Sequence, residues 1–156
     1  MFQAGTRGFN GYNFKDGTTA SWTLGCPVSD MQRFKEKGDD FERLPLRQED
    51  WDEKIGTVRS LSLPIHRFSE DVTSILLPPD CTLRQLIEAV DAFYMKPLTA
   101  SDLEPLHDCM YNYLDEAKKK LAAGETVTYL DLMGELKYYE GVEAMDDGSL
   151  RLMLGS

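Results

Sequence analysis

Apolar residues between positions 83 and 94 recur every three or four residues, which is the spacing of one face of an α-helix. Thr82 and Gln85 have the spacing of a capping box at its start, and Pro97 prevents its continuation. The apolar face consists of Leu83, Leu86, Ile87, Val90, Phe93 and Tyr94. We expect this face to pack on a sheet whose core residues are Leu61, Leu63, Ile75, Leu77, Leu150 and Leu152.

A second helix is predicted from Asp102 to Leu121. Ser101 and Glu104 repeat the capping-box spacing, and Pro105 would then lie in the first turn, where proline is tolerated. Its apolar stripe consists of Leu103, Leu106, Met110, Leu114, Ala117 and Leu121.

Alternation of apolar and polar residues predicts strands on both sides of these helices. The segments 58–66 and 72–77 form a predicted hairpin, with Pro64 indicating an edge position. The segment 126–130 is a strand candidate, 136–139 is a weaker one, and 150–154 is a strong final strand. The fold class predicted is therefore α+β, a mixed sheet packed by one or two helices.

The first 28 residues have a composition of their own. Five of the 12 glycines lie at or before position 25, with aromatic residues interleaved among them. Because glycine permits turns and aromatic rings supply burial, we expect an ordered arm, with a flexible tail as the alternative. The candidate partner-binding residues of this arm are Phe2, Phe9, Tyr12, Phe14 and Trp22.

Three segments follow from these patterns: an N-terminal arm (1–28), an acidic connecting region with short helices (29–56) and an α+β domain (57–156). Within the connecting region we expect helical turns from Asp30 to Lys37 and from Arg47 to Lys54.

The chain carries 27 acidic and 17 basic residues, a net charge of −10, and residues 29–156 alone carry −11. Direct binding to nucleic-acid phosphate requires clustered Lys and Arg, so we expect neither that nor docking on an anionic membrane. Three widely spaced cysteines, Cys26, Cys81 and Cys109, suit free thiols in a reducing intracellular compartment or a virion.

Catalytic patterns are sparse. His107 and Cys109 would diverge by about 200° on a helix, which is incompatible with a dyad. The acidic residues around Trp51 are the candidates for a hard cation, namely Asp50, Asp52 and Glu53. Solvated loop charge is the preferred interpretation of this group. We therefore expect no cofactor and no resident metal.

Two segments resemble a known family. Ile75 to Val90 (ILLPPDCTLRQLIEAV) is similar to the second strand and helix opening of ubiquitin-like domains, and Gly148 to Gly155 (GSLRLMLG) resembles their last strand. The resemblance covers residues 58–154 and implies a β-grasp fold. Two features depart from it, the long helix predicted after residue 101 and a terminal Gly155-Ser156 in place of a diglycine.

Shorter segments are similar to uncharacterised small proteins of large DNA viruses and protists. They are Phe93-Tyr94, Pro97 to Thr99, Met133 to Glu135, Tyr139 to Gly141 and Leu154 to Ser156. This similarity implies a structural or host-interacting viral protein.

Together these observations predict a non-enzymatic protein–protein interaction module, an accessory or structural component of a larger assembly. Its protein partners would bind through the arm, and homo- and hetero-oligomers are both open. One alternative is an acidic inhibitor or nucleic-acid mimic, which needs one continuous carboxylate face. The other is a carboxylate- or metal-dependent enzyme around Glu49 to Glu53, which needs a concave pocket holding these acids.

Overall fold

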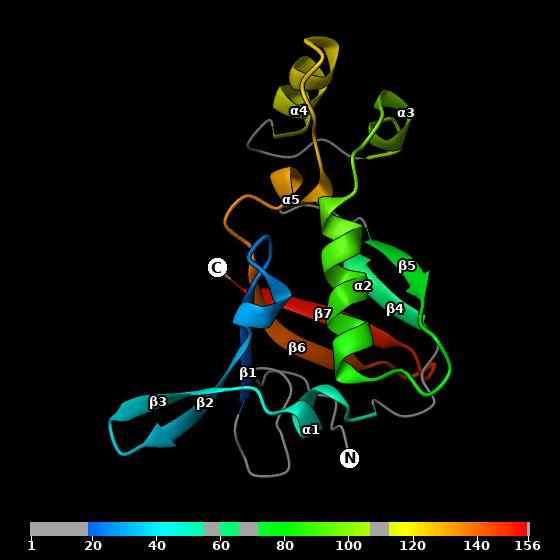
Figure 1. Ribbon diagram of the computed structural model, residues 1–156. Coiled ribbons are helices and arrows are strands. Elements are labelled where there is room, and N and C mark those ends of the chain that lie inside the picture. The colour runs from blue at the N-terminus through cyan, green and yellow to red at the C-terminus, as the bar shows by residue number, and fades with distance from the viewer. Residues whose placement is uncertain (1–18, 55–59, 66–71, 107–112, 156) are drawn as a thin grey trace.

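The computed structural model describes residues 19–54, 60–65, 72–106 and 113–155, and its main element is a seven-stranded mixed sheet (Figure 1). The strand order is β3-β2-β1-β6-β7-β4-β5. Neighbouring strands are antiparallel except β4 and β7, which are parallel. The strands are β1 (Thr19–Thr23), β2 (Gln32–Lys37), β3 (Asp40–Pro45), β4 (Ser60–Pro64), β5 (Val72–Leu76), β6 (Tyr138–Ala144) and β7 (Leu150–Gly155). With five α-helices in the described residues, the predicted α+β class is confirmed.

Helix α2 (Leu83–Met95) crosses one face of this sheet, as the periodicity predicts (Figure 1). Its capping box is formed: the Gln85 backbone N–H donates to Thr82 Oγ1 (3.2 Å), and the Thr82 N–H donates to Gln85 Oε1 (3.0 Å). Leu86, Ile87 and Val90 are fully buried and share one core with the sheet residues expected to receive them. We call this side of the sheet the helix face and the other side the open face.

The second predicted helix is not continuous. It begins as α3 (Ala100–Leu103), and α4 (Tyr113–Ala122) follows after a segment outside the described residues that includes Met110. The capping pair lies two residues earlier than predicted, because the Thr99 N–H donates to Asp102 Oδ2 (2.7 Å). Pro105 therefore falls beyond the first turn, where its missing N–H and its ring end the helix.

Residues 126–130 are also not the strand that we predicted. The Thr128 N–H donates to Asp131 Oδ2 (2.8 Å), and this cap starts the short helix α5 (Tyr129–Leu132). The final strand β7 is confirmed, and β6 extends further than the segment 136–139 predicted for it.

A second, smaller core holds α3, α4 and α5 together at one end of α2 (Figure 1). It consists of Ile65, Leu98, Leu103, Leu106, Leu114, Ala117, Val127 and Leu132. Phe93 joins it to the main core, since its ring stacks on Tyr129 at 4.8 Å and meets the edge of Tyr94 at 5.0 Å.

The N-terminal half contributes strands to the same sheet. Strand β1 lies between β2 and β6, and the hairpin β2–β3 extends away from the body of the molecule (Figure 1). The expected helical turns from Asp30 to Lys37 are wrong, because β2 occupies most of that range after the short 3-10 turn η1 (Val28–Asp30). The helix around Trp51 is confirmed as α1 (Gln48–Trp51). The described sheet thus draws strands from all three sequence segments.

None of the helices in the described ranges is long and apolar enough to cross a membrane.

Candidate functional site

Strands β1 and β2 have two chemically distinct sides. On the helix face, Ala20, Trp22 and Arg33 are buried, while their neighbours in sequence are directed to the open face. Paired residues on neighbouring strands lie on the same face, and Ser21 pairs with Gln32 while Thr23 pairs with Tyr138. The open face therefore continues from β1 onto both of its neighbours. The open face at this end of the sheet is therefore partly polar and accessible.

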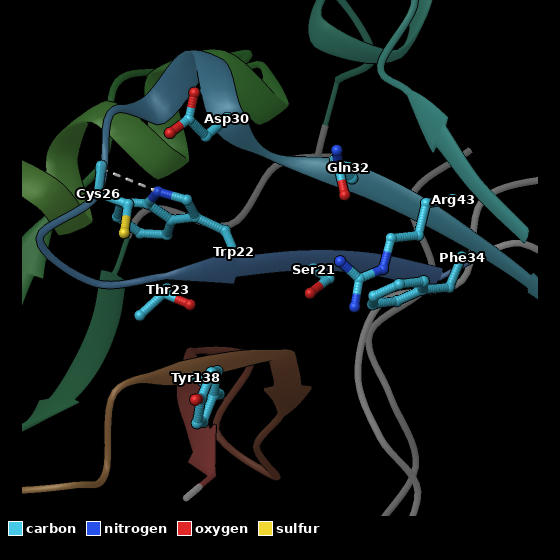
Figure 2. A pocket seen from close by; sticks show the side chains of 9 residues that line it. All are labelled: Ser21, Trp22, Thr23, Cys26, Asp30, Gln32, Phe34, Arg43 and Tyr138. Atoms are coloured by element: carbon cyan, nitrogen blue, oxygen red, sulfur yellow. Dashed lines mark hydrogen bonds between the residues drawn. The ribbon is translucent and has the colours of Figure 1, made fainter. Parts of the chain in front are cut away.

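A hollow of about 290 Å³ lies where β1, η1, β2 and β3 meet (Figure 2). Its lining consists of Ser21, Trp22, Thr23, Cys26, Asp30, Gln32, Phe34, Arg43 and Tyr138. A second hollow, lined by Thr23, Gly134, Glu135, Lys137 and Tyr138, shares two of these residues. The two hollows therefore adjoin along the exposed ring of Tyr138.

An aromatic and arginine cluster lies on the hairpin beside the first hollow. The rings of Phe34 and Phe41 meet edge to face, with centroids 6.4 Å apart. The guanidinium of Arg43, which pairs with Phe34 across the strands, lies over the Phe34 ring at 5.4 Å (Figure 2). Phe41 is 67% exposed. We call Phe34, Phe41 and Arg43 the hairpin cluster.

Tyr138 and Tyr139 face opposite sides of β6, as their adjacency predicts. Tyr138 is 53% exposed on the open face, whereas Tyr139 is buried in the main core. Burial raises the pKa of the Tyr139 phenol far above its ordinary value, so this side chain stays neutral. Tyr138 thus adds a third accessible aromatic ring near the hairpin cluster.

Trp22, one of the predicted partner-binding residues, is a core residue. It is 3% exposed, and its Nε1–H donates to the Cys26 carbonyl at 3.1 Å (Figure 2). Gly25 makes the turn possible with a φ of +87°, and a Cβ there would lie 2.8 Å from Leu130 Cδ2. The Trp22 ring therefore offers little accessible surface, at the lining of the first hollow.

The other four arm residues, Phe2, Phe9, Tyr12 and Phe14, lie outside the described residues. Thr19, the first described residue, pairs with Phe34. The arm is therefore attached to the sheet directly beside the hairpin cluster.

Asp50, a candidate metal ligand, is enclosed by two arginines. Its carboxylate lies 3.5 Å from Arg33 Nε and 3.0 Å from an Arg47 terminal nitrogen, and it accepts the Arg47 backbone N–H at 2.8 Å. Asp50 and Arg33 are both almost fully buried. Two positive partners already compensate this carboxylate, an environment that disfavours an added cation.

The other metal candidates, Asp52 and Glu53, have contacts of their own. The Asp52 carboxylate accepts hydrogen bonds from the Gln48 side chain, and the Glu53 carbonyl accepts the Leu83 N–H at 2.8 Å. In the described part of the chain, no group of three or more His, Cys, Asp and Glu side chains is placed to hold a metal.

Charges on the hairpin alternate in sign across its two strands. Lys35 pairs with Glu42, and Lys37 pairs with Asp40. Such pairing stabilises a hairpin and differs from the continuous carboxylate face that an acidic mimic requires.

The cysteines occupy different environments. Cys81 is buried beside the start of α2, where desolvation raises the pKa of its thiol, and its Sγ lies 3.4 Å from the Thr82 carbonyl. Cys26 is exposed at the rim of the first hollow. Both are free thiols, and Cys109 lies outside the described residues.

No family model, curated protein or solved structure gives a significant match to this chain.

Sequence reasoning missed the hairpin cluster. Its signal is the cross-strand placement of Phe34 and Arg43, which follows only once residues 32–37 are recognised as a strand. Residues 41 and 43 then share a hairpin with residue 34, and the strand register predicts an accessible aromatic ring next to an arginine.

Proposed function

We propose that the protein is a non-enzymatic interaction module, an accessory or structural component of a larger assembly. The observation that carries the proposal is the hairpin cluster, in which two aromatic rings and a guanidinium are held together on an extended, accessible hairpin. Aromatic residues and arginine are enriched at the energetic centres of protein interfaces.

The contacts within the hairpin cluster favour binding for a second reason. Arg43 rests on Phe34, and Phe34 contacts Phe41, so each side chain is held by its neighbours before a partner arrives. Ordering a long side chain at an interface costs about 0.5–1.5 kcal/mol, and prior ordering reduces this cost. The adjoining hollows at Tyr138 supply concave surface beside these projecting rings.

The arm belongs to the same proposal. Since the chain enters the sheet at Thr19, opposite Phe34, the residues before it are attached at the edge of the hairpin cluster. We propose that Phe2, Phe9, Tyr12 and Phe14 bind the same partner as the hairpin cluster.

A ubiquitin-like β-grasp over residues 58–154 is part of the proposal. Its support is the succession of hairpin β4–β5, helix α2 and final strand β7, with β7 pairing parallel to β4. Helices α3 to α5 and the added strands β1 to β3 distinguish this chain from ubiquitin itself.

Affinity capture from the source cells, followed by mass spectrometry, tests the proposal. The bait variant carries Phe41→Ser and Arg43→Ser, both at exposed positions. A matched control carries Met95→Ser, an exposed apolar residue at the end of α2. The proposal expects a protein that the wild type and the control retain and the double variant loses. Identical captured sets for all three baits would contradict it.

A further inference from the structure

The two edges of the sheet differ in how they are protected. The β3 edge carries Asp40, Glu42 and Arg43 and ends at Pro45, which are the features that discourage pairing with another strand. The β5 edge, Val72–Leu76, has neither a charge nor a proline. In the described chain β4 is its only strand neighbour.

The exposed side chains of β5 lie on the open face. Leu76 is 86% exposed and Val72 is 53% exposed, with exposed Ser74 between them. Their neighbours Thr73 and Ile75 are half-buried and pair with the core residues Leu63 and Leu61. Within the described ranges, the strand therefore combines an unpaired edge with two exposed aliphatic side chains on one side.

The free edge also offers backbone groups. Pro64 pairs with Val72 but has no N–H, so that pair cannot exchange two hydrogen bonds. Hydrogen-bonded and non-hydrogen-bonded pairs alternate in an antiparallel ladder, so Thr73 and Ile75 bond to β4. Val72, Ser74 and Leu76 consequently direct their N–H and C=O groups toward the edge that no described strand covers.

We propose that a second copy of this chain pairs with β5 through its own β5, antiparallel, about a two-fold axis at Ser74. In this register Val72 lies opposite Leu76 of the second copy, and Ser74 lies opposite Ser74. The outward backbone groups of residues 72, 74 and 76 then meet as hydrogen-bonded pairs. The exposed Val72 and Leu76 side chains of the two copies form two apolar pairs on the open face, one on each side of the Ser74 pair.

Charge favours a second copy at this edge over other parts of the surface. Two chains of net charge −10 repel each other, and a symmetric contact doubles any charge that it contains. Residues 72–76 contain no charge, so they can meet without opposing like charges. Screening of the remaining repulsion predicts that association strengthens as ionic strength rises.

Sedimentation equilibrium of the full chain with matched lysine variants tests the contact. Ser74→Lys would place two like charges opposite each other at the axis, whereas Ser62→Lys adds the same charge on the paired strand β4. The wild type and Ser62→Lys are expected to dimerise, and Ser74→Lys to bind at least about tenfold more weakly with an unchanged melting profile. A wild type that stays monomeric up to its solubility limit, or equal dimerisation by Ser74→Lys, overturns the proposal.

Cross-linking tests the register. In a chain with Cys26→Ser and Cys109→Ser, a short bis-maleimide is expected to join copies carrying Ser74→Cys. Ser62→Cys is the control, because the two residues 62 would be three strand spacings apart, about 14 Å. Cross-linking at position 62 but not at position 74 contradicts the proposed register.

Discussion

The Nε atom of Arg33 lies 3.5 Å from a carboxylate oxygen of Asp50, and both side chains are buried. Arg47 contacts the same carboxylate through its side chain and its backbone N–H. The contact between Arg33 and Asp50 connects strand β2 to helix α1.

Asp50→Ala is expected to lower the free energy of unfolding by about 3–5 kcal/mol, because it removes a buried carboxylate that faces the buried Arg33 and also contacts Arg47. Chemical denaturation measures the change. Asp52→Ala, at an exposed position of the same segment, is expected to change stability by about 0.5 kcal/mol or less. Equal effects of the two substitutions would show that the Arg33–Asp50 contact contributes little.

The same contact explains why the sequence predicts this part of the fold poorly. In β2, the inward position held by Arg33 has a charged side chain, so no apolar alternation marks the strand. The distant Asp50 supplies a counter-charge for that buried side chain. Helix α2, by contrast, has its cap and its apolar face within 13 consecutive residues, and local patterns were sufficient to predict it.

The predicted helix boundaries between residues 99 and 131 are wrong for a related reason. Two capping pairs were possible around Pro105, and the pair Thr99–Asp102 forms in preference to Ser101–Glu104. The candidate site was less predictable still, since Phe34 and Arg43 become neighbours only through the β2–β3 register.

Removing the hydroxyl group from each of two buried tyrosines should change the stability of the fold by different amounts. Tyr94 Oη donates to the Pro64 carbonyl at 2.6 Å, so Tyr94→Phe is expected to cost about 1–3 kcal/mol of stability. Tyr139 Oη is buried with no hydrogen-bond partner in the described residues. Tyr139→Phe is therefore expected to leave stability unchanged or raise it. Thermal melts of both variants would decide, and a larger loss for Tyr139→Phe would contradict this assignment.

The packing of α2 in the main core can be tested by comparing a Leu→Ala substitution at a buried and at an exposed position. Leu86 is fully buried between α2 and the sheet, so Leu86→Ala is expected to cost about 2–5 kcal/mol. Leu76→Ala changes a side chain that is 86% exposed and is expected to cost about 0.5 kcal/mol or less in dilute solution. Denaturant titration compares them. A loss below about 1 kcal/mol for Leu86→Ala would mean that another side of α2 carries the packing.

The cap of α3 makes a small contribution that depends on pH. The Thr99 backbone N–H and hydroxyl donate to Asp102 and hold the pKa of its carboxyl below the ordinary value. A pKa lowered by folding gives stability that is present above the unfolded-state pKa of about 3.9 and is lost as pH falls through the folded pKa. The stability difference between wild type and Asp102→Ala should therefore narrow below about pH 3.9. Ser101→Ala, which removes no titrating group, should give a difference that does not vary with pH.

Deletion of residues 1–18 separates the possible roles of the arm while leaving β1 intact. If Phe2, Phe9, Tyr12 and Phe14 bind a partner, as we propose, the shortened chain should keep its melting temperature and lose the captured partner. If these rings belong to the core, the melting temperature should fall markedly, because each buried aromatic ring contributes a few kcal/mol. If the arm is a flexible tail, its deletion should change neither property.

Trp22→Ala provides the reference for a core ring, with an expected loss of stability of about 3–5 kcal/mol. Circular dichroism melts reveal loss of core packing, and capture reveals loss of binding. The deletion leaves the β5 edge intact, so any dimer formed there should persist. Loss of the partner with the dimer retained would show that the arm binds its partner independently of the β5 contact.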